Sequence, residues 1–171
     1  MNIIGIDLAG KPENPTGICI LQNNGAALSI VFSDDDILRI VGEYKPEVIA
    51  LDAPIMQGNP RIRKADRELK KYGAMPPTLP SMQSLTFRGS NLANNLLKHY
   101  RVIEVFPTAT AKILGVYNQE YQKTAETLNI VVENKHELDA FLCCLTGQLY
   151  LQDKTIEVGD KTGTIVVPKN Q

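Results

Sequence analysis

Acidic side chains close or interrupt three apolar runs of the sequence. Asp7 closes Ile3–Ile6, Asp52 closes Val48–Leu51, and Glu104 interrupts a third run. A carboxylate is costly to bury alone, so acids on three apolar strands predict a shared partner. If the strands that carry Asp7 and Asp52 are parallel neighbours, these two carboxylates repel unless they share a proton or a cation. The pair therefore favours a divalent metal site, for which Mg²⁺ or Mn²⁺ would be the ion.

Each acid also has a structural interpretation. A carboxylate at the end of a strand can cap the next helix or bond loop amides, and for either aspartate alone this role is as good as catalysis. Glu104 could instead pair with a buried lysine or arginine. The turn 7–10, with an acid, small residues and a glycine, would also suit a phosphate-cradling loop. The metal interpretation is favoured only for Asp7 and Asp52 taken together.

A third carboxylate is predicted on the last helix, 135–151. His136 and Asp139 are three residues apart, so both project from one helix face. Asp139 lies inside the helix beside apolar positions, which favours a role as a metal ligand with Asp7 and Asp52. His136 could bind metal through a ring nitrogen or shuttle a proton, or it could serve only as a capping group.

A basic stretch lies in the long connection after Asp52. Residues 61–71, RIRKADRELKK, hold six basic side chains against two acidic ones. Such a pattern is typical of a solvated helix face, and it also fits a stripe that contacts flanking phosphates of a nucleic acid. The candidate substrate-binding residues at helical spacing are Arg63, Lys64, Arg67, Lys70 and Lys71, with Thr78, Ser81, Gln83 and Ser84 as neutral candidates in the next loop.

The elements that must position these residues are predicted from periodicity. Strands are expected at 2–8, 17–22, 27–32, 47–51 and 101–106, with a hairpin turn at Asn23-Asn24-Gly25. A helix is expected after Ser33, ending near Tyr44 before Pro46. Further helices are predicted at 60–72, 91–98, 108–114, 118–128 and 135–151, and a hairpin at 155–167.

This order predicts one α/β domain over residues 1–171 with the ribonuclease H-like fold. A hairpin meander followed by β-α-β units gives a mixed five-stranded sheet, order 3-2-1-4-5, flanked by helices. The connection between strands four and five, about 55–99, is a helical insertion because it is long for such a link. A C-terminal β-hairpin completes the fold.

Composition limits the kinds of partner and cellular location that the chain can have. The 171 residues carry 18 basic and 19 acidic side chains, so a general nucleic-acid coat is excluded and any such contact must be local. Cys19, Cys143 and Cys144 lack the spacing of a zinc site and are predicted as buried residues of a reducing cytoplasm. Neither a signal peptide nor a membrane span is predicted, so a cytoplasmic location is expected.

The ordered motifs resemble a known family. They are GIDLAG at 5–10, LDAPI at 51–55, RKADRELKKYG at 63–73, VIEVFPTA at 102–109, HELDAF at 136–141 and the closing GDKTGTIVVPK. Together they resemble the predicted ribonuclease H-like nucleases of the family called domain of unknown function 429, which is more distantly similar to RuvC-type resolvases. The resemblance implies that Asp7, Asp52, His136 and Asp139 occupy the positions of a two-metal site, and that Glu104 matches the family's acid on strand five.

The leading functional hypothesis is a metal-dependent nuclease that hydrolyses phosphodiester bonds of DNA or RNA by a two-metal mechanism. Asp7, Asp52, His136 and Asp139 would be catalytic, and Glu104 is a further candidate. Two alternatives remain open: an actin-like nucleotide-binding phosphotransferase, for which the chain has little room, and a catalytically inactive ribonuclease H-like binding module. A homodimer would suit a junction-type enzyme, although the sequence marks no interface.

Overall fold

A five-stranded mixed sheet forms the centre of the molecule. The computed structural model describes residues 2–23 and 25–170, so Asn24 of the expected turn lies outside the described residues. The strand order is β3-β2-β1-β4-β5, with β1, β2 and β3 antiparallel and β4 and β5 parallel to β1, which confirms the predicted sheet. The strands are β1 (Ile3–Asp7), β2 (Thr16–Gln22), β3 (Gly25–Val31), β4 (Val48–Asp52) and β5 (Val102–Glu104).

The helices and the final hairpin surround this sheet. Ser33 caps the first helix by accepting a hydrogen bond from the Asp36 amide, as its position predicted. The predicted last helix and the closing hairpin are also present. The elements are α1 (Asp34–Tyr44), α2 (Lys64–Glu68), the 3₁₀ helix η1 (Leu69–Tyr72), α3 (Pro80–Leu96), α4 (Pro107–Ile113), α5 (Tyr121–Thr127), α6 (Lys135–Leu151), β6 (Thr155–Asp160) and β7 (Gly163–Pro168).

The insertion between β4 and β5 differs from its prediction. The helix expected at 60–72 is split into α2 and η1, and it ends at Gly73 with φ 104°. The helix expected at 91–98 begins much earlier, at Pro80, because proline is accepted in a first turn, where its missing N–H leaves no bond unmade. Ser81, Gln83 and Ser84 therefore lie on α3 and not in a loop.

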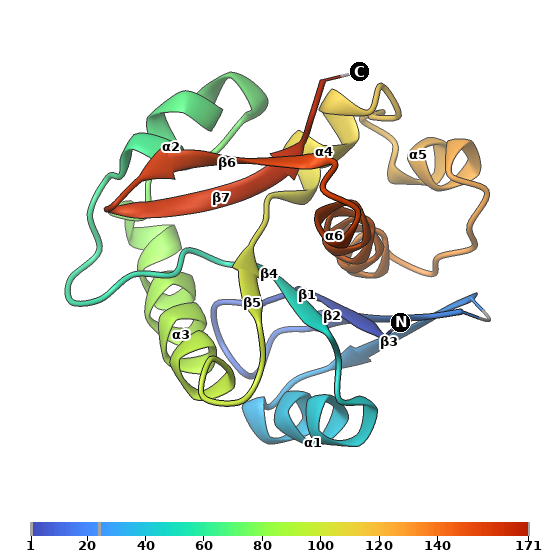
Figure 1. Ribbon diagram of the computed structural model, residues 1–171, viewed down its shortest axis with the longest axis horizontal. Helices are drawn as coiled ribbons and strands as arrows, with labels where there is room; N and C mark the ends of the chain where they lie inside the picture. The colour runs from blue at the N-terminus through green and yellow to red at the C-terminus, as the bar shows by residue number, and fades with distance from the viewer. Residues whose placement is uncertain (1, 24, 171) are drawn as a thin grey trace.

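The two faces of the sheet pack against different helices (Figure 1). Ile4 and Ile6 belong to the core under α1 and α3, whereas Ile3 belongs to the core under α6. Side chains alternate between the faces of a strand, so Asp7 faces α6 with Ile3. The same alternation places Asp52 on the α6 face with Val48 and Ala50.

Helix α6 approaches the sheet closely at two glycines. A Cβ at Gly5 would overlap the carbonyl oxygen of Ala140, and a Cβ at Gly17 would overlap that of His136. Gly17 is the antiparallel neighbour of Asp7 in the β1–β2 register. The first turn of α6 therefore lies directly over the end of β1, and the missing side chains of the glycines allow it.

Gly5→Ala is expected to destabilise the protein by about 1–3 kcal/mol or more, because the added methyl group collides with backbone atoms that cannot rotate away. Gly42→Ala is the matched control. It lies in α1 with nothing within 4 Å of an added Cβ, and replacing a helical glycine should stabilise by about 0.5–1 kcal/mol. Urea unfolding curves measure both, and equal stability of the two variants would contradict the close approach of α6.

Candidate functional site

Asp7 and Asp52 lie side by side at the carboxyl ends of two adjacent strands. They are direct partners in the parallel register of β1 and β4. Neighbouring strands are about 4.8 Å apart, and paired residues of parallel strands point to the same face. The two carboxylates are therefore crowded together beneath the first turns of α6, which confirms that the predicted pair is adjacent.

Asp139 adds a third negative charge from α6. Burial is the largest cause that raises the pKa of Asp52 well above its ordinary value, followed by the charges of Asp7 and Asp139. Burial also raises the pKa of Asp139, with the charge of Asp7 as the next cause. These mutual effects indicate that the three acids share one electrostatic site. Its first and last members, Asp7 and Asp139, are 132 positions apart in the sequence.

Two nitrogen-bearing side chains of α6 are hydrogen-bonded to this acidic site. His136 Nδ1 lies 2.7 Å from Asp7 Oδ2, and this hydrogen bond is the main cause that raises the pKa of His136. Lys135 Nζ donates to Asp139 Oδ2 at 2.9 Å. Burial is the largest single cause and lowers the pKa of Lys135, but the bond to Asp139 and the charges of Asp139, Asp7 and Asp52 together give a net upward shift. Lys135 was not predicted as a site residue, although its i, i+4 spacing to Asp139 was a usable signal.

Glu104 lies on the opposite face of the sheet. It pairs with Leu51 in the β4–β5 register, and both face the core under α1 and α3. Its carboxylate accepts two hydrogen bonds of 2.7 Å from the Arg63 guanidinium and one of 2.8 Å from the Ile55 amide. Glu104 therefore anchors the insertion to β5, and the structure does not bring it into the acidic site with Asp7.

Arg63 was predicted to belong to the basic stripe, but the structure places it elsewhere. Its side chain is buried, and its guanidinium donates to Asp66 as well as to Glu104. With every guanidinium nitrogen bonded to a carboxylate, Arg63 has no donor group directed at a phosphate. Spacing could not distinguish this residue from its exposed neighbours, because its main partner Glu104 is 41 residues away.

No protein-family model matches the chain, and no curated protein matches its sequence. Among solved structures, it is similar to "T. thermophilus RuvC in complex with Holliday junction substrate" with a TM-score of 0.54. The alignment has 14% identity and covers 90% of this chain and 96% of that chain. The fold is ribonuclease H-like. The resemblance to the family called domain of unknown function 429 stays a prediction, as does the homodimer.

The acids of this ribonuclease H-like chain fit a divalent cation by their chemistry. Three oxygen-bearing side chains are crowded enough to raise the pKa of two of them, and a bound cation would relieve that repulsion. Within residues 2–23 and 25–170, however, no three His, Cys, Asp or Glu side chains are already arranged around one point. Asp7 and Asp139 are hydrogen-bonded to His136 and Lys135 instead.

The other predicted basic residues are exposed. Lys64 forms an ion pair of 3.5 Å with Glu68 and, together with Arg67, helps to lower the pKa of Asp160 in the hairpin, after the hydrogen bonds from Thr162. Lys70 is exposed, and Lys71 Nζ lies 5.1 Å from the centre of the Tyr72 ring. These four side chains of α2 and η1 are thus available to a partner in solvent.

Arg88 is a positioning residue that the sequence did not reveal. It is buried on α3 and donates to the carbonyl oxygens of Ala9 and Phe32, both at 2.7 Å, and to Asp34 at 2.8 Å. Ala9 lies two residues after Asp7. Arg88 therefore fixes the loop that leaves the acidic site and ties it to the start of α1.

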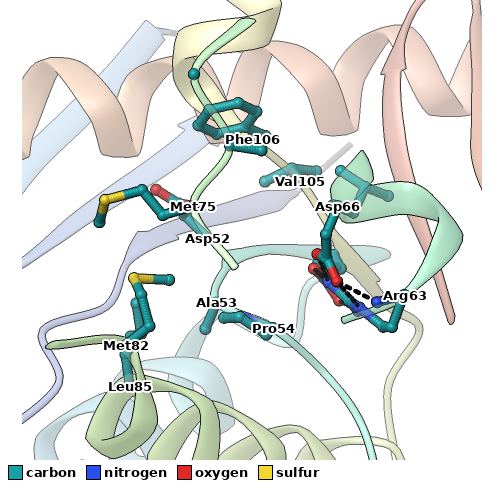
Figure 2. A pocket seen from close by; sticks show the side chains of 14 residues that line it. Asp52, Ala53, Pro54, Arg63, Asp66, Met75, Met82, Leu85, Val105 and Phe106 are labelled. Carbon is teal, nitrogen blue, oxygen red and sulfur yellow. Dashed lines mark hydrogen bonds and ion pairs between the residues drawn. The ribbon is translucent and has the colours of Figure 1, made fainter. Parts of the chain in front are cut away.

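A pocket of about 290 Å³ opens beside Asp52. Figure 2 shows Met75 and Met82 on one side and the Arg63–Asp66 pair on the other, with Phe106 above. We call it the methionine pocket.

In the described part of the chain, no helix is long and apolar enough to cross a membrane.

Arg63→Met is expected to lower the free energy of unfolding by about 3–5 kcal/mol, because Glu104 and Asp66 would stay buried without their partner. The exposed Arg67→Met is the control and should change it by less than about 0.5 kcal/mol. Chemical denaturation measures both. A similar small effect for the two variants would show that Arg63 does not anchor the insertion.

Asp52→Asn is expected to raise the melting temperature of the metal-free protein at neutral pH. Because the folded state holds the Asp52 proton more tightly than the unfolded state, stability of the wild type falls as pH rises from the ordinary carboxyl pKa through the raised one. Asparagine carries no charge and removes that loss. Melting curves from pH 4 to pH 8 should diverge with rising pH, and parallel curves would contradict the shift.

Proposed function

We propose that this protein is a metal-dependent nuclease that hydrolyses phosphodiester bonds of nucleic acid. The observation that carries the proposal is the register pairing of Asp7 with Asp52, with Asp139 delivered to the same site by α6. Crowded carboxylates of this kind lower the stability of the folded state unless a cation is bound, so a purely structural role does not account for them. The similarity of fold to a RuvC protein solved with a Holliday junction substrate supports nucleic acid as the substrate class.

The three aspartates would hold Mg²⁺ or Mn²⁺, as the ions of a two-metal mechanism. When bound, such ions activate a water molecule and stabilise the leaving oxygen of the phosphodiester. Carboxylate oxygens suit these ions better than nitrogen ligands do, which makes Asp7, Asp52 and Asp139 the ligand set and leaves His136 for another task.

His136 and Lys135 would act from the α6 side of the site. In the structure they are hydrogen-bonded to Asp7 and Asp139, so a cation that takes over these carboxylates would release both side chains. The His136 side chain is half-exposed, and its pKa is raised by Asp7. It is therefore placed to hold a proton at the edge of the cleft and to transfer it to a departing oxygen.

Substrate phosphates beyond the scissile bond would be held locally. The chain carries a net charge of −1, so binding cannot rest on its overall charge. The exposed side chains of Lys64, Arg67, Lys70 and Lys71 supply a basic surface on the insertion. Each phosphate contact made by such a residue adds to the salt dependence of binding.

The direct test is cleavage of single-stranded, duplex and branched DNA and RNA with Mg²⁺ or Mn²⁺. Asp7→Asn should reduce the rate at least about 100-fold, because it removes one of the shared ligands. Asp35→Asn is the matched control: it makes the same change on an exposed residue of α1 and should leave the rate unchanged.

Melting curves with and without Mn²⁺ accompany the assay. Native-state metal binding raises the melting temperature, and Asp7→Asn should abolish that rise. Cleavage that survives Asp7→Asn would contradict the assignment. The absence of both cleavage and metal stabilisation would favour the inactive binding module, and tight ATP binding by calorimetry would favour the phosphotransferase.

A further inference from the structure

The methionine pocket and the acidic site share Asp52. Asp52 belongs to both, because it ends β4 where the chain turns into the insertion. Ala53 and Pro54 continue the pocket wall, Met75 and Met82 come from the insertion, and Phe106 comes from the start of α4. A polymer held at the aspartates would therefore have one of its own groups beside this pocket.

The charges of the pocket exclude a phosphate. Its ionisable groups are the carboxylates of Asp52, Asp66 and Glu104 and the single guanidinium of Arg63. The Arg63 nitrogens already donate to Asp66 and Glu104, so no cationic donor remains to attract an anion. The remaining lining is apolar, and the occupant must be a neutral group with apolar faces.

We infer that the methionine pocket receives one unstacked nucleobase of the strand whose phosphodiester lies at Asp7 and Asp52. This inference rests on the proposed function, since the aspartates place the strand. A base is flat and neutral, with π faces that suit the Phe106 ring and the thioethers of Met75 and Met82. Met75 is 50% exposed, and its flexible side chain can close over a ring that has entered.

The size of the pocket defines the substrate further. A volume of about 290 Å³ is near the lower end of small-molecule sites, so the pocket holds one base and not a base pair. Unstacking is least costly where a base is already unpaired, which points to single strands or unpaired positions in a duplex. The buried carboxylates are bonded to Arg63, so recognition would rest on stacking, which tolerates every base.

Photo-crosslinking tests the inference without relying on cleavage. Wild-type protein is mixed with Ca²⁺, which also takes oxygen ligands, and a single-stranded oligonucleotide that carries 4-thiothymidine, irradiated, and digested with trypsin. Cleavage after Lys71 and Arg88 releases one peptide, 72–88, that contains both pocket methionines, and Phe106 lies in peptide 102–112. Crosslinks at Met75, Met82 or Phe106 are the expected result.

The double variant Met75→Ala, Met82→Ala should lose about 10-fold of this crosslink yield, because the stacking walls are removed. Leu79→Ala is the matched control. Leu79 is an exposed apolar residue of the same tryptic peptide that does not line the pocket, and its loss should change the yield by less than about twofold. Circular dichroism and melting curves confirm that each variant is folded.

The outcomes separate the two proposals. Crosslinks only in other peptides, a yield that the double methionine change leaves unaltered, or no crosslink at all overturns the base pocket. If the wild type nevertheless cleaves nucleic acid, the nuclease proposal stands without it. If the pocket residues crosslink as expected but no nucleic acid is cleaved under any metal condition, the base pocket stands and the nuclease proposal is overturned.

Discussion

Two carboxylates on adjacent parallel strands repel each other, and the site is arranged around that repulsion. Asp7 and Asp52 are register partners, so backbone hydrogen bonding of the sheet holds them together whatever their charges prefer. Asp139 increases the repulsion, and the raised pKa values of Asp52 and Asp139 are its result together with burial. His136 and Lys135 lessen it in the metal-free chain. Such an arrangement costs folding stability, and the divalent cation proposed above would relieve that cost.

Close packing of α6 is what turns this edge of the sheet into a site. Without side chains at Gly5 and Gly17, the helix backbone rests directly on β1 and β2. Its first turns then carry His136, Lys135 and Asp139 over the end of β1. A larger residue at either glycine would lift the helix, and both the neutralising contacts and the third carboxylate would move away together.

The insertion between β4 and β5 is held in place by paired charges. Arg63, Asp66 and Glu104 form a buried ion cluster in which each partner is satisfied, whereas the acidic site is left with excess negative charge. Breaking such a cluster leaves a buried charge unpaired, so it fixes the start of α2 against β5. The same cluster forms one wall of the methionine pocket and makes that wall unsuitable for anions. The paired charges of this cluster and the unpaired negative charge of the candidate site thus both lie near Asp52, with different consequences for what can bind.

The sequence by itself determined the strand order, the limits of α6 and the three aspartates of the candidate site. Hydrophobic periodicity and strand ends are local, and parallel neighbours bring carboxyl ends together at one edge, so the residue pattern was enough to pair Asp7 with Asp52. Only the tertiary structure decided the face of Glu104, because β5 is apolar on both sides of that residue and alternation gives no answer. It also decided that Arg63 is buried while Lys64 and Arg67 are exposed, that Arg88 fixes the loop after Asp7, and that a pocket opens beside Asp52. Each of these depends on contacts between residues far apart in the chain, which spacing along the sequence does not encode.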